Sequence, residues 1–202
     1  MPNIFIHGIV DAPAPPQWLI DKAGKLVTNG VPKITAITWE DDFTARPLLY
    51  KNGVIWHNAV NHCTYLDEEC LTWSRENVTK HTKDIRLAAT TPGLASTGAH
   101  IDRIRNYVLI YLLETGGDDH QTVFYQEKGI SELIRPKEYH WHADNYDDLS
   151  IVSVIRLEVN KWNLMTTKVL HSVENIAQGR RSIQISLDNF LDDAVITNIT
   201  NL

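Results

Sequence analysis

Two histidines, an aspartate and an arginine stand in this sequence at spacings that could build a metal site. His100 and Asp102 form an H-x-D motif, and His171 follows 71 residues after His100. Arg180 lies nine residues beyond His171, with Ser182 just behind it. Two imidazoles and one carboxylate can occupy one face of an octahedral ferrous ion and leave three positions open. An arginine beside such an ion offers a planar fork to a carboxylate, so the set indicates metal-assisted chemistry with a carboxylate-bearing molecule.

The C-terminal part of this set is more specific than the H-x-D motif. Composition alone predicts roughly 0.7 H-x-D pairs by chance, and two occur, at His100 and at His142. An R-x-S motif nine residues behind a histidine is expected only roughly 0.02 times. His171, Arg180 and Ser182 therefore indicate the chemistry, and an H-x-D motif supplies the partners.

The first 80 residues, which precede these motifs, are predicted to be helical or mixed. A proline is tolerated in the first turn of a helix, and Asn or Thr can cap one. The elements expected here are a short strand over residues 3–9, a helix from Pro16 toward Lys25, and a second helix from Asn61 or Thr64 to about Arg75. The run Asp67–Glu69 is interpreted as a solvated face near the start of that second helix.

From about residue 81 the chain changes to short β-branched or apolar runs separated by turn residues. These runs are Ile85–Thr90, Tyr107–Leu113, Thr122–Gln126, Ile151–Val159, Lys168–Val173 and Ser182–Leu187. Gly116 and Gly117 mark a hairpin between two of them. Such a density of short strands predicts an antiparallel sandwich or barrel. We expect one domain, with a β core over residues 81–190, a supporting part over 1–80 and a tail over 191–202.

Alternation along residues 180–187 gives the last predicted strand two different faces. Arg180, Ser182 and Gln184 share one face, while Ile183 and Ile185 share the other. If the polar face lines the interior of the barrel, it can form a carboxylate pocket. The alternative is a strand whose polar side faces water, and the R-x-S spacing favours the pocket.

These residues resemble the Fe(II)- and 2-oxoglutarate-dependent oxygenases, particularly their prolyl-hydroxylase-like branch. His100, Asp102, His171, Arg180 and Ser182 match that family's motif position by position, and the Gly-Gly hairpin resembles the one that follows its H-x-D motif. The resemblance covers about residues 95–190. It implies a double-stranded β-helix, that is, a jelly-roll or cupin-like barrel, supported by N-terminal helices. It also implies that Arg180 and Ser182 bind the distal carboxylate of 2-oxoglutarate.

The resemblance also separates the two H-x-D candidates. The family's barrel places about five strands between its two metal-binding ends, whereas the 29 residues from His142 to His171 hold only about three strands of average length. We therefore assign His100, Asp102 and His171 to the metal. His142 is interpreted as a loop histidine, as is His140, although an H-x-H pair is also the cupin metal pattern.

Three further residues near these motifs receive expectations. In many enzymes of this branch a tyrosine on the strand after H-x-D donates a hydrogen bond to the same carboxylate, and Tyr111 is the residue chosen here, with a core tyrosine as the alternative. Arg103 and Arg105 flank the metal motif and are interpreted mainly as surface ion-pairing residues. The loop Arg135–Ser150 is long enough to close over a site.

The implied function is a 2-oxoglutarate-dependent hydroxylase that uses Fe(II), 2-oxoglutarate and O2 and releases succinate and CO2. Its substrate would be an amino acid, a peptidyl side chain or another small polar molecule. Asp102 is present where halogenases of the family lack a carboxylate, which favours hydroxylation. Two alternatives stay open: a cupin-like metalloenzyme that does not use 2-oxoglutarate, and a non-catalytic β-sandwich binding module.

Composition limits the partners and the compartment. The net charge is −6 and no Lys/Arg-rich block occurs, so neither nucleic acid nor a membrane is expected as a partner. The start of the chain lacks the basic and apolar regions of a signal peptide. Cys63 and Cys70 are the only two cysteines and are expected to be reduced thiols in a cytoplasmic protein. Nothing in the sequence determines the oligomeric state.

Overall fold

Two β-sheets and two helices make up most of the computed structural model. It describes residues 7–25, 27–28, 31–32, 49–51, 54–56, 61–90, 94–102, 105–131, 145–187 and 199–200, and the statements below concern these residues. The second H-x-D candidate, the H-x-H pair, Arg103 and most of the 135–150 loop lie outside them.

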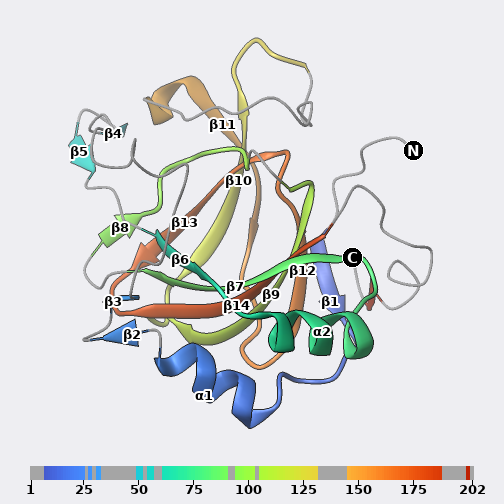
Figure 1. The fold of residues 1–202 in the computed structure, drawn as a ribbon. Helices are drawn as coiled ribbons and strands as arrows, with labels where there is room; N and C mark the ends of the chain where they lie inside the picture. Colours follow the sequence, from blue (N-terminus) through green and yellow to red (C-terminus); the bar gives the residue numbers. More distant parts are fainter. Residues whose placement is uncertain are drawn as a thin grey trace.

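The eight strands of the β core form two facing sheets, and the chain changes sheet after each of them except β10, which pairs with β11 (Figure 1). One sheet contains the run β7-β14-β9-β12, and the other has the order β8-β13-β10-β11. All pairs within these sheets are antiparallel. This strand order is that of a jelly roll, or double-stranded β-helix. The strands are β7 (Thr82–Thr90), β8 (Leu94–Ser96), β9 (Tyr107–Thr115), β10 (Gln121–Glu127), β11 (Leu149–Ile155), β12 (Trp162–Thr166), β13 (Leu170–Ile176) and β14 (Arg180–Leu187).

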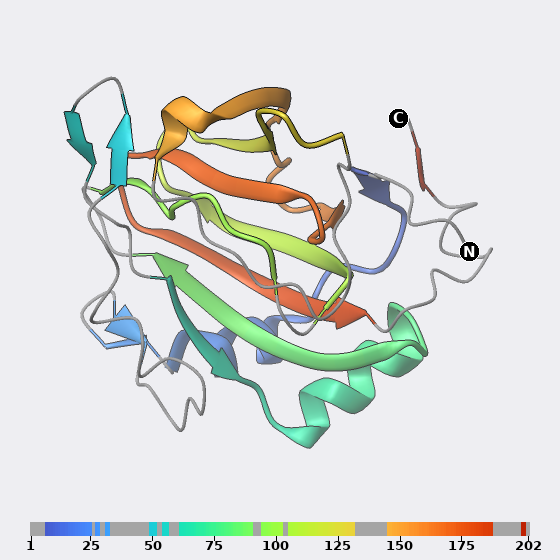
Figure 2. The same cartoon turned by 90° about the horizontal axis from the view of Figure 1, so that it is seen from above.

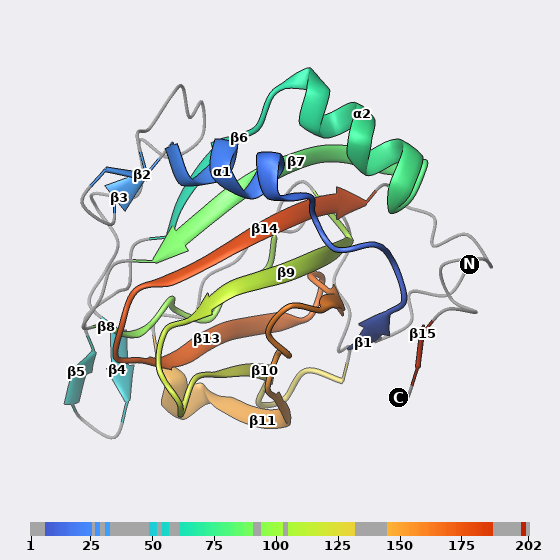
Figure 3. The same cartoon turned by 90° about the horizontal axis from the view of Figure 1, so that it is seen from below.

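Segments outside the core extend and cover the larger sheet. Strands β1 (His7–Val10) and β15 (Ile199–Thr200) lengthen it at one edge, and β6 (Asn61–Tyr65) lengthens it at the other. Helices α1 (Gln17–Lys25) and α2 (Glu68–Asn77) lie across its outer face (Figures 2 and 3). Neither is long and apolar enough to cross a membrane. The remaining elements are β2 (Val27–Thr28), β3 (Val31–Pro32), β4 (Leu49–Lys51), β5 (Val54–Trp56) and the 3-10 turn η2 (Tyr146–Asp148).

Strand β9 shows how alternation divides the core into layers. Tyr107, Leu109 and Tyr111 pack in the cluster that joins the larger sheet to Leu19 of α1 and Cys70 of α2. The alternate residues Val108, Ile110 and Leu112 pack with Phe124 of the smaller sheet. The first cluster therefore lies outside the barrel, beneath the helices, and the second lies between the two sheets. A third cluster, which includes Val123, Tyr125 and Tyr146, covers the outer side of the smaller sheet.

The second predicted helix begins later than expected. Residues Asn61–Tyr65 form strand β6, paired with β7, instead of opening the helix. The N-cap of α2 is Asp67, whose side chain accepts a hydrogen bond from the Cys70 backbone N–H at 3.3 Å. Pairing with a neighbouring strand thus overrides the capping signals upstream. Glu68 and Glu69 are exposed in the first turn, as predicted.

Two core strands were not predicted. Strand β12 is buried at every position, because one face packs beneath the helices and the other packs between the sheets. It therefore lacks the alternation by which a half-exposed strand is recognised. Strand β8 has only three residues, too few to show a pattern. The predicted run Ile151–Val159 is shorter in the structure, since β11 ends at Ile155.

Candidate metal and carboxylate site

The backbone places His100 and His171 directly opposite one another. They form an antiparallel bridge in which each backbone N–H donates to the other residue's carbonyl at 2.9 Å. His171 also lies opposite Phe124 of β10, a residue packed between the sheets. Cross-strand partners point to the same face. Both imidazoles therefore face the barrel interior, and their ring centroids lie 4.6 Å apart.

Asp102 joins the two histidines from the loop that follows His100. Its backbone N–H donates to the carbonyl of Thr167 at 3.1 Å, which fixes the loop next to the connection between β12 and β13. One carboxylate oxygen, Oδ1, lies 3.5 Å from Nε2 of His100. One ligand atom from each of His100, Asp102 and His171 lies within 4.8 Å of the others. The structure thus brings together the three residues that the sequence assigned to a metal.

Backbone carbonyls determine which nitrogen each histidine presents. Nδ1 of His100 lies 2.8 Å from the carbonyl of Gly98, and Nδ1 of His171 lies 2.8 Å from that of Val169. A carbonyl oxygen only accepts hydrogen bonds, so both Nδ1 atoms carry the proton. Each Nε2 then keeps its lone pair, and this is the outer-shell arrangement usual for metal-binding histidines.

The charge states of the triad also suit a divalent cation. Burial alone would raise the pKa of Asp102, but Arg105 and the two imidazoles hold it well below its ordinary value. Burial lowers the pKa of His171 to about 4, and His100 adds to this effect. At neutral pH the aspartate is therefore ionised and His171 is neutral, and metal binding requires both states.

Arg180 is a buried cation whose donors are partly unused. Arg180 is the first residue of β14, and it is 3 % exposed. Among the described residues, its Nε and Nη2 atoms have no hydrogen-bond partner. Burial lowers its pKa to about 10. A guanidinium removed from water without partners is costly unless an anion meets it. These two donors fit a carboxylate.

The polar face of β14 does line the interior. Ser182, Gln184 and Ser186 lie opposite Leu112, Ile110 and Val108 of β9, which pack between the sheets. Ile183, Ile185 and Leu187 instead join the cluster beneath the helices. Ser182 is buried and accepts a hydrogen bond from Gln184 Nε2 at 3.2 Å. The outward residue Arg181 pairs with Glu114 at the surface.

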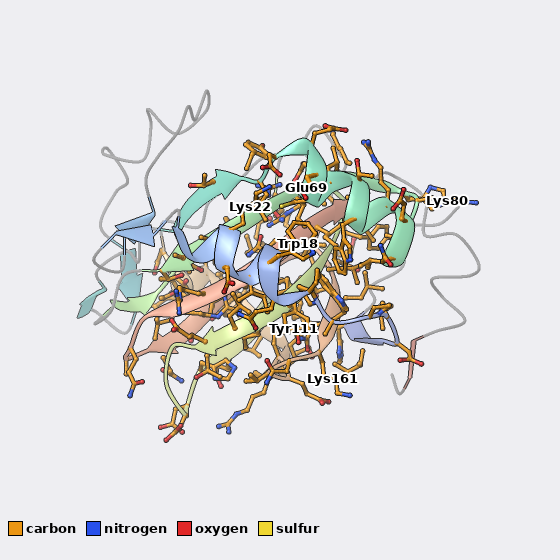
Figure 4. All side chains as sticks on the ribbon, turned by 60° about the horizontal axis from the view of Figure 1, so that its bottom comes forward. Trp18, Lys22, Glu69, Lys80, Tyr111 and Lys161 are labelled. Atoms are coloured by element: carbon orange, nitrogen blue, oxygen red, sulfur yellow. The ribbon has the colours of Figure 1, made fainter. Side chains whose placement is uncertain are left out.

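Tyr111 lies on the opposite face of the larger sheet from this pocket. It packs beneath the helices and contacts Trp162 at a ring-centroid distance of 5.2 Å. Figure 4, which brings the helix-bearing side forward, shows Tyr111 on that side of the sheet. The expectation that it donates to the same carboxylate as Arg180 is not met by this arrangement. The residues that face inward on this strand are Val108, Ile110 and Leu112.

Two residues at the site were not identified from the sequence. Arg105, interpreted there as a surface residue, is mostly buried and its Nε pairs with Oδ2 of Asp102. Gly116 has a φ of +90°, and a Cβ there would lie 3.0 Å from Cβ of Arg180. The position of Arg105 three residues after Asp102 was visible in the sequence, but a charged residue near a turn is usually solvated.

Comparison with known proteins adds little to this picture. No family model matches the chain, and no curated protein matches its sequence. The chain is similar to the X-ray structure of E. coli ycfD (TM-score 0.44, 11 % identity) over 93 % of its own length, and it spans 57 % of that chain. It is also similar to an oxidoreductase of the 2OG-Fe(II) oxygenase family from Burkholderia pseudomallei (TM-score 0.41, 14 % identity, 83 % of this chain and 89 % of that chain). A cupin-like protein from Thermotoga maritima matches at a TM-score of 0.28 and 14 % identity, over 64 % of this chain and 69 % of that chain. Similarities this weak say nothing about ligands, and the strand order itself establishes the barrel.

Proposed function

We propose that this protein is an Fe(II)- and 2-oxoglutarate-dependent dioxygenase that hydroxylates a small polar substrate and releases succinate and CO2. The observation that carries the proposal is the buried guanidinium of Arg180, whose Nε and Nη2 have no hydrogen-bond partner in the described part of the chain. A metal triad alone serves many reactions. A triad together with a buried guanidinium that has two unused donors among the described residues, on the interior face of the same barrel, supports a cosubstrate that carries its own carboxylate.

The residues divide the work of binding. His100, Asp102 and His171 would hold the iron through Nε2, one carboxylate oxygen and Nε2. Arg180 would hold the distal carboxylate of 2-oxoglutarate. With both groups bound, iron and the 2-oxo acid supply the oxidation of a C–H bond by dioxygen. The protein's own contribution is orientation, fixed tautomers and exclusion of water.

The interior face beside the triad supports a polar substrate. Arg86 of β7 is buried and donates to Ser186 Oγ at 2.6 Å, while Ser186 donates to Asp84 at 2.7 Å. These groups continue the polar face of β14 onto the neighbouring strand. An amino acid, a peptidyl side chain or a similar small molecule fits such a surface better than a lipid does. The acidic net charge supports neither nucleic acid nor membrane as a partner.

Anaerobic titration tests this function directly. Fe(II) is added first and 2-oxoglutarate second, while the visible metal-to-ligand charge-transfer band is followed. We expect a band in the wild type, and its 2-oxoglutarate affinity should fall at least about tenfold in Arg180→Ala, because one charge-assisted pair is worth roughly 1.5 to 3 kcal/mol. Arg181→Ala is the matched control and should leave the affinity unchanged.

The same titration separates the alternatives. Iron binding without a 2-oxoglutarate band would indicate a cupin-like metalloenzyme. Absence of iron binding would indicate a binding module. A band that keeps its affinity in Arg180→Ala would contradict the role given to this arginine.

A further inference from the structure

The two oxygens of the Asp102 carboxylate have different surroundings. Oδ1 faces Nε2 of His100 at 3.5 Å, on the side of the metal triad. Oδ2 accepts a hydrogen bond from Nε of Arg105, which also forms an ion pair with it. One oxygen is thus available to a metal while the other is already engaged.

Arg105 is itself held at several points. Its Nη1 donates to Gln184 Oε1 at 2.9 Å, and its backbone carbonyl accepts from Thr167 Oγ1 at 2.7 Å. Gln184 in turn donates to Ser182 at 3.2 Å. A chain of hydrogen bonds therefore runs from Asp102 through Arg105 and Gln184 to the interior face of β14. The same strand begins with Arg180.

We propose that Arg105 is a positioning residue that keeps Asp102 a one-oxygen metal ligand. The inference rests on the proposed metal site. A carboxylate that binds through both oxygens would take a fourth position on an octahedral ion, and only two would stay open. A chelating 2-oxo acid needs two, and the reaction needs one more. By occupying Oδ2, Arg105 reserves that third position.

A different role for Arg105 would be simple charge neutralisation of Asp102 when no cation is present. The geometry argues against it. The guanidinium approaches Oδ2, whereas Nε2 of His100 lies against Oδ1, and Gln184 binds the Nη1 end of the guanidinium. A cation bound at the triad can therefore occupy its place without displacing Arg105.

Counting metal-bound waters tests the proposal without turnover. Mn(II) is bound to the full-length protein, and the broadening of its EPR lines by ¹⁷O-water is measured. In the wild type we expect three waters, one for each open position. In Arg105→Ala we expect two, because Asp102 is then free to bind through both oxygens. The Mn(II)-loaded variant should still bind 2-oxoglutarate at its two open positions, but no metal-bound water should remain afterwards, whereas the wild type should keep one.

Two further variants complete the experiment. Gln184→Leu keeps the ion pair between Arg105 and Asp102 but removes the hydrogen bond that holds Nη1 of Arg105. The average number of metal-bound waters should then lie between two and three. This variant provides the test if Arg105→Ala does not fold. Arg181→Ala removes the same charge from the outer face and should keep three waters.

The outcomes are distinguishable from those of the proposed function. Three waters in both Arg105→Ala and Gln184→Leu, or two in the wild type, would overturn the role of Arg105 and leave the metal site intact. A wild type that binds no Mn(II) would overturn both.

Discussion

The burial of Arg180 leads us to expect that its guanidinium destabilises the ligand-free protein. The side chain is buried, and the lowered pKa of about 10 reflects the loss of hydration around its charge. We therefore expect Arg180→Met to raise the free energy of unfolding of the ligand-free protein by about 1 to 4 kcal/mol. Urea denaturation with and without 2-oxoglutarate measures this effect.

The ligand should distinguish the two proteins. In the presence of metal, 2-oxoglutarate should add stability to the wild type and add much less to Arg180→Met, which keeps the metal triad. Arg181→Met, on the exposed face, should shift stability by less than about 1 kcal/mol. A less stable Arg180→Met protein would show that the guanidinium already has partners in the ligand-free state.

The lowered pKa of His171 leads us to expect that the metal-free protein loses stability in acid. Its ordinary pKa of 6.5 falls to about 4 in the folded protein, chiefly by burial. Between these values the unfolded chain takes up a proton that the folded chain does not. This stability is complete above pH 6.5 and is lost as the pH falls toward 4, by on the order of 3 kcal/mol in total.

Urea midpoints from pH 7 to 4.5, measured with a chelator present, test this dependence. His171→Gln should flatten the slope in that window. Asp102 acts at lower pH, because its folded pKa lies well below the ordinary value of 3.8. An unchanged slope in His171→Gln would assign the acid sensitivity to other groups.

Residue types and spacing pointed to His171, Arg180 and two H-x-D pairs, and the family resemblance then selected His100 and Asp102. Neither could determine which face of a strand looks inward. Tyr111 was chosen on the strand that follows H-x-D. It alternates with the inward residues of that strand, so its side chain packs beneath the helices. Only the packing of Phe124 against Val108, Ile110 and Leu112 shows which face is interior. Arg105 was missed for a related reason, since its burial comes from β14, 79 residues away.

At the scale of elements, the turn between β9 and β10 constrains the arginine pocket. Gly116 adopts a φ of +90°, and an added Cβ would meet Arg180 Cβ at 3.0 Å and Ile176 Cγ2 at 3.1 Å. We expect Gly116→Ala to cost about 1 to 3 kcal/mol in backbone strain and to weaken 2-oxoglutarate binding by moving Arg180. Thermal unfolding and the charge-transfer titration measure the two effects.

Two other glycines serve as controls. Gly129 has a φ of +83° with nothing within 4 Å, so Gly129→Ala should show the backbone strain without the loss of affinity. Gly24 lies in α1, and a Cβ added there would meet no atom within 4 Å. Gly24→Ala should therefore raise the free energy of unfolding by up to about 1 kcal/mol. Unchanged 2-oxoglutarate affinity in Gly116→Ala would show that the pocket adapts.

Strand β14, with one polar and one apolar face, and strand β9, a long apolar run before a Gly-Gly turn, were predictable from the sequence. Residues 182–187 alternate cleanly, and this segment lies within β14. Strand β12 is covered on both sides, so its sequence carries no period of two. The start of α2 was misplaced because strand pairing with β7 competes with a local capping signal. Alternation and long apolar runs can therefore be recognised in the sequence, whereas short strands and pairing partners depend on tertiary contacts.

At the scale of the whole molecule, the metal triad joins segments that are distant in the chain. His100 and Asp102 lie near β8, while His171 belongs to β13. A bound ion would cross-link them, and ligands that bind only the folded state stabilise it. At a concentration 100 times its dissociation constant, Mn(II) should raise the free energy of unfolding by about 2.7 kcal/mol. This increase corresponds to a rise of roughly 5 to 10 °C in the midpoint of thermal unfolding.

Differential scanning fluorimetry with Mn(II) and with a chelator measures this shift. His171→Ala should lose this shift, whereas His81→Ala, just before β7, should keep it. A shift of equal size in His171→Ala would place the stabilising ion elsewhere.

The layer beneath α1 and α2 has a consequence for how this protein can change. The apolar cluster that binds the helices to the larger sheet lies outside the barrel, and the residues that surround the candidate site project from the other face of the same strands. Substitutions at Ala88, Ser182 or Ser186 therefore do not touch that cluster, whereas substitutions at Leu87, Ile183 or Ile185 do. The residues that stabilise the fold and the residues that surround the site thus lie on opposite faces of the same strands. Selection for a new substrate can change the inner face while the outer face keeps the chain folded.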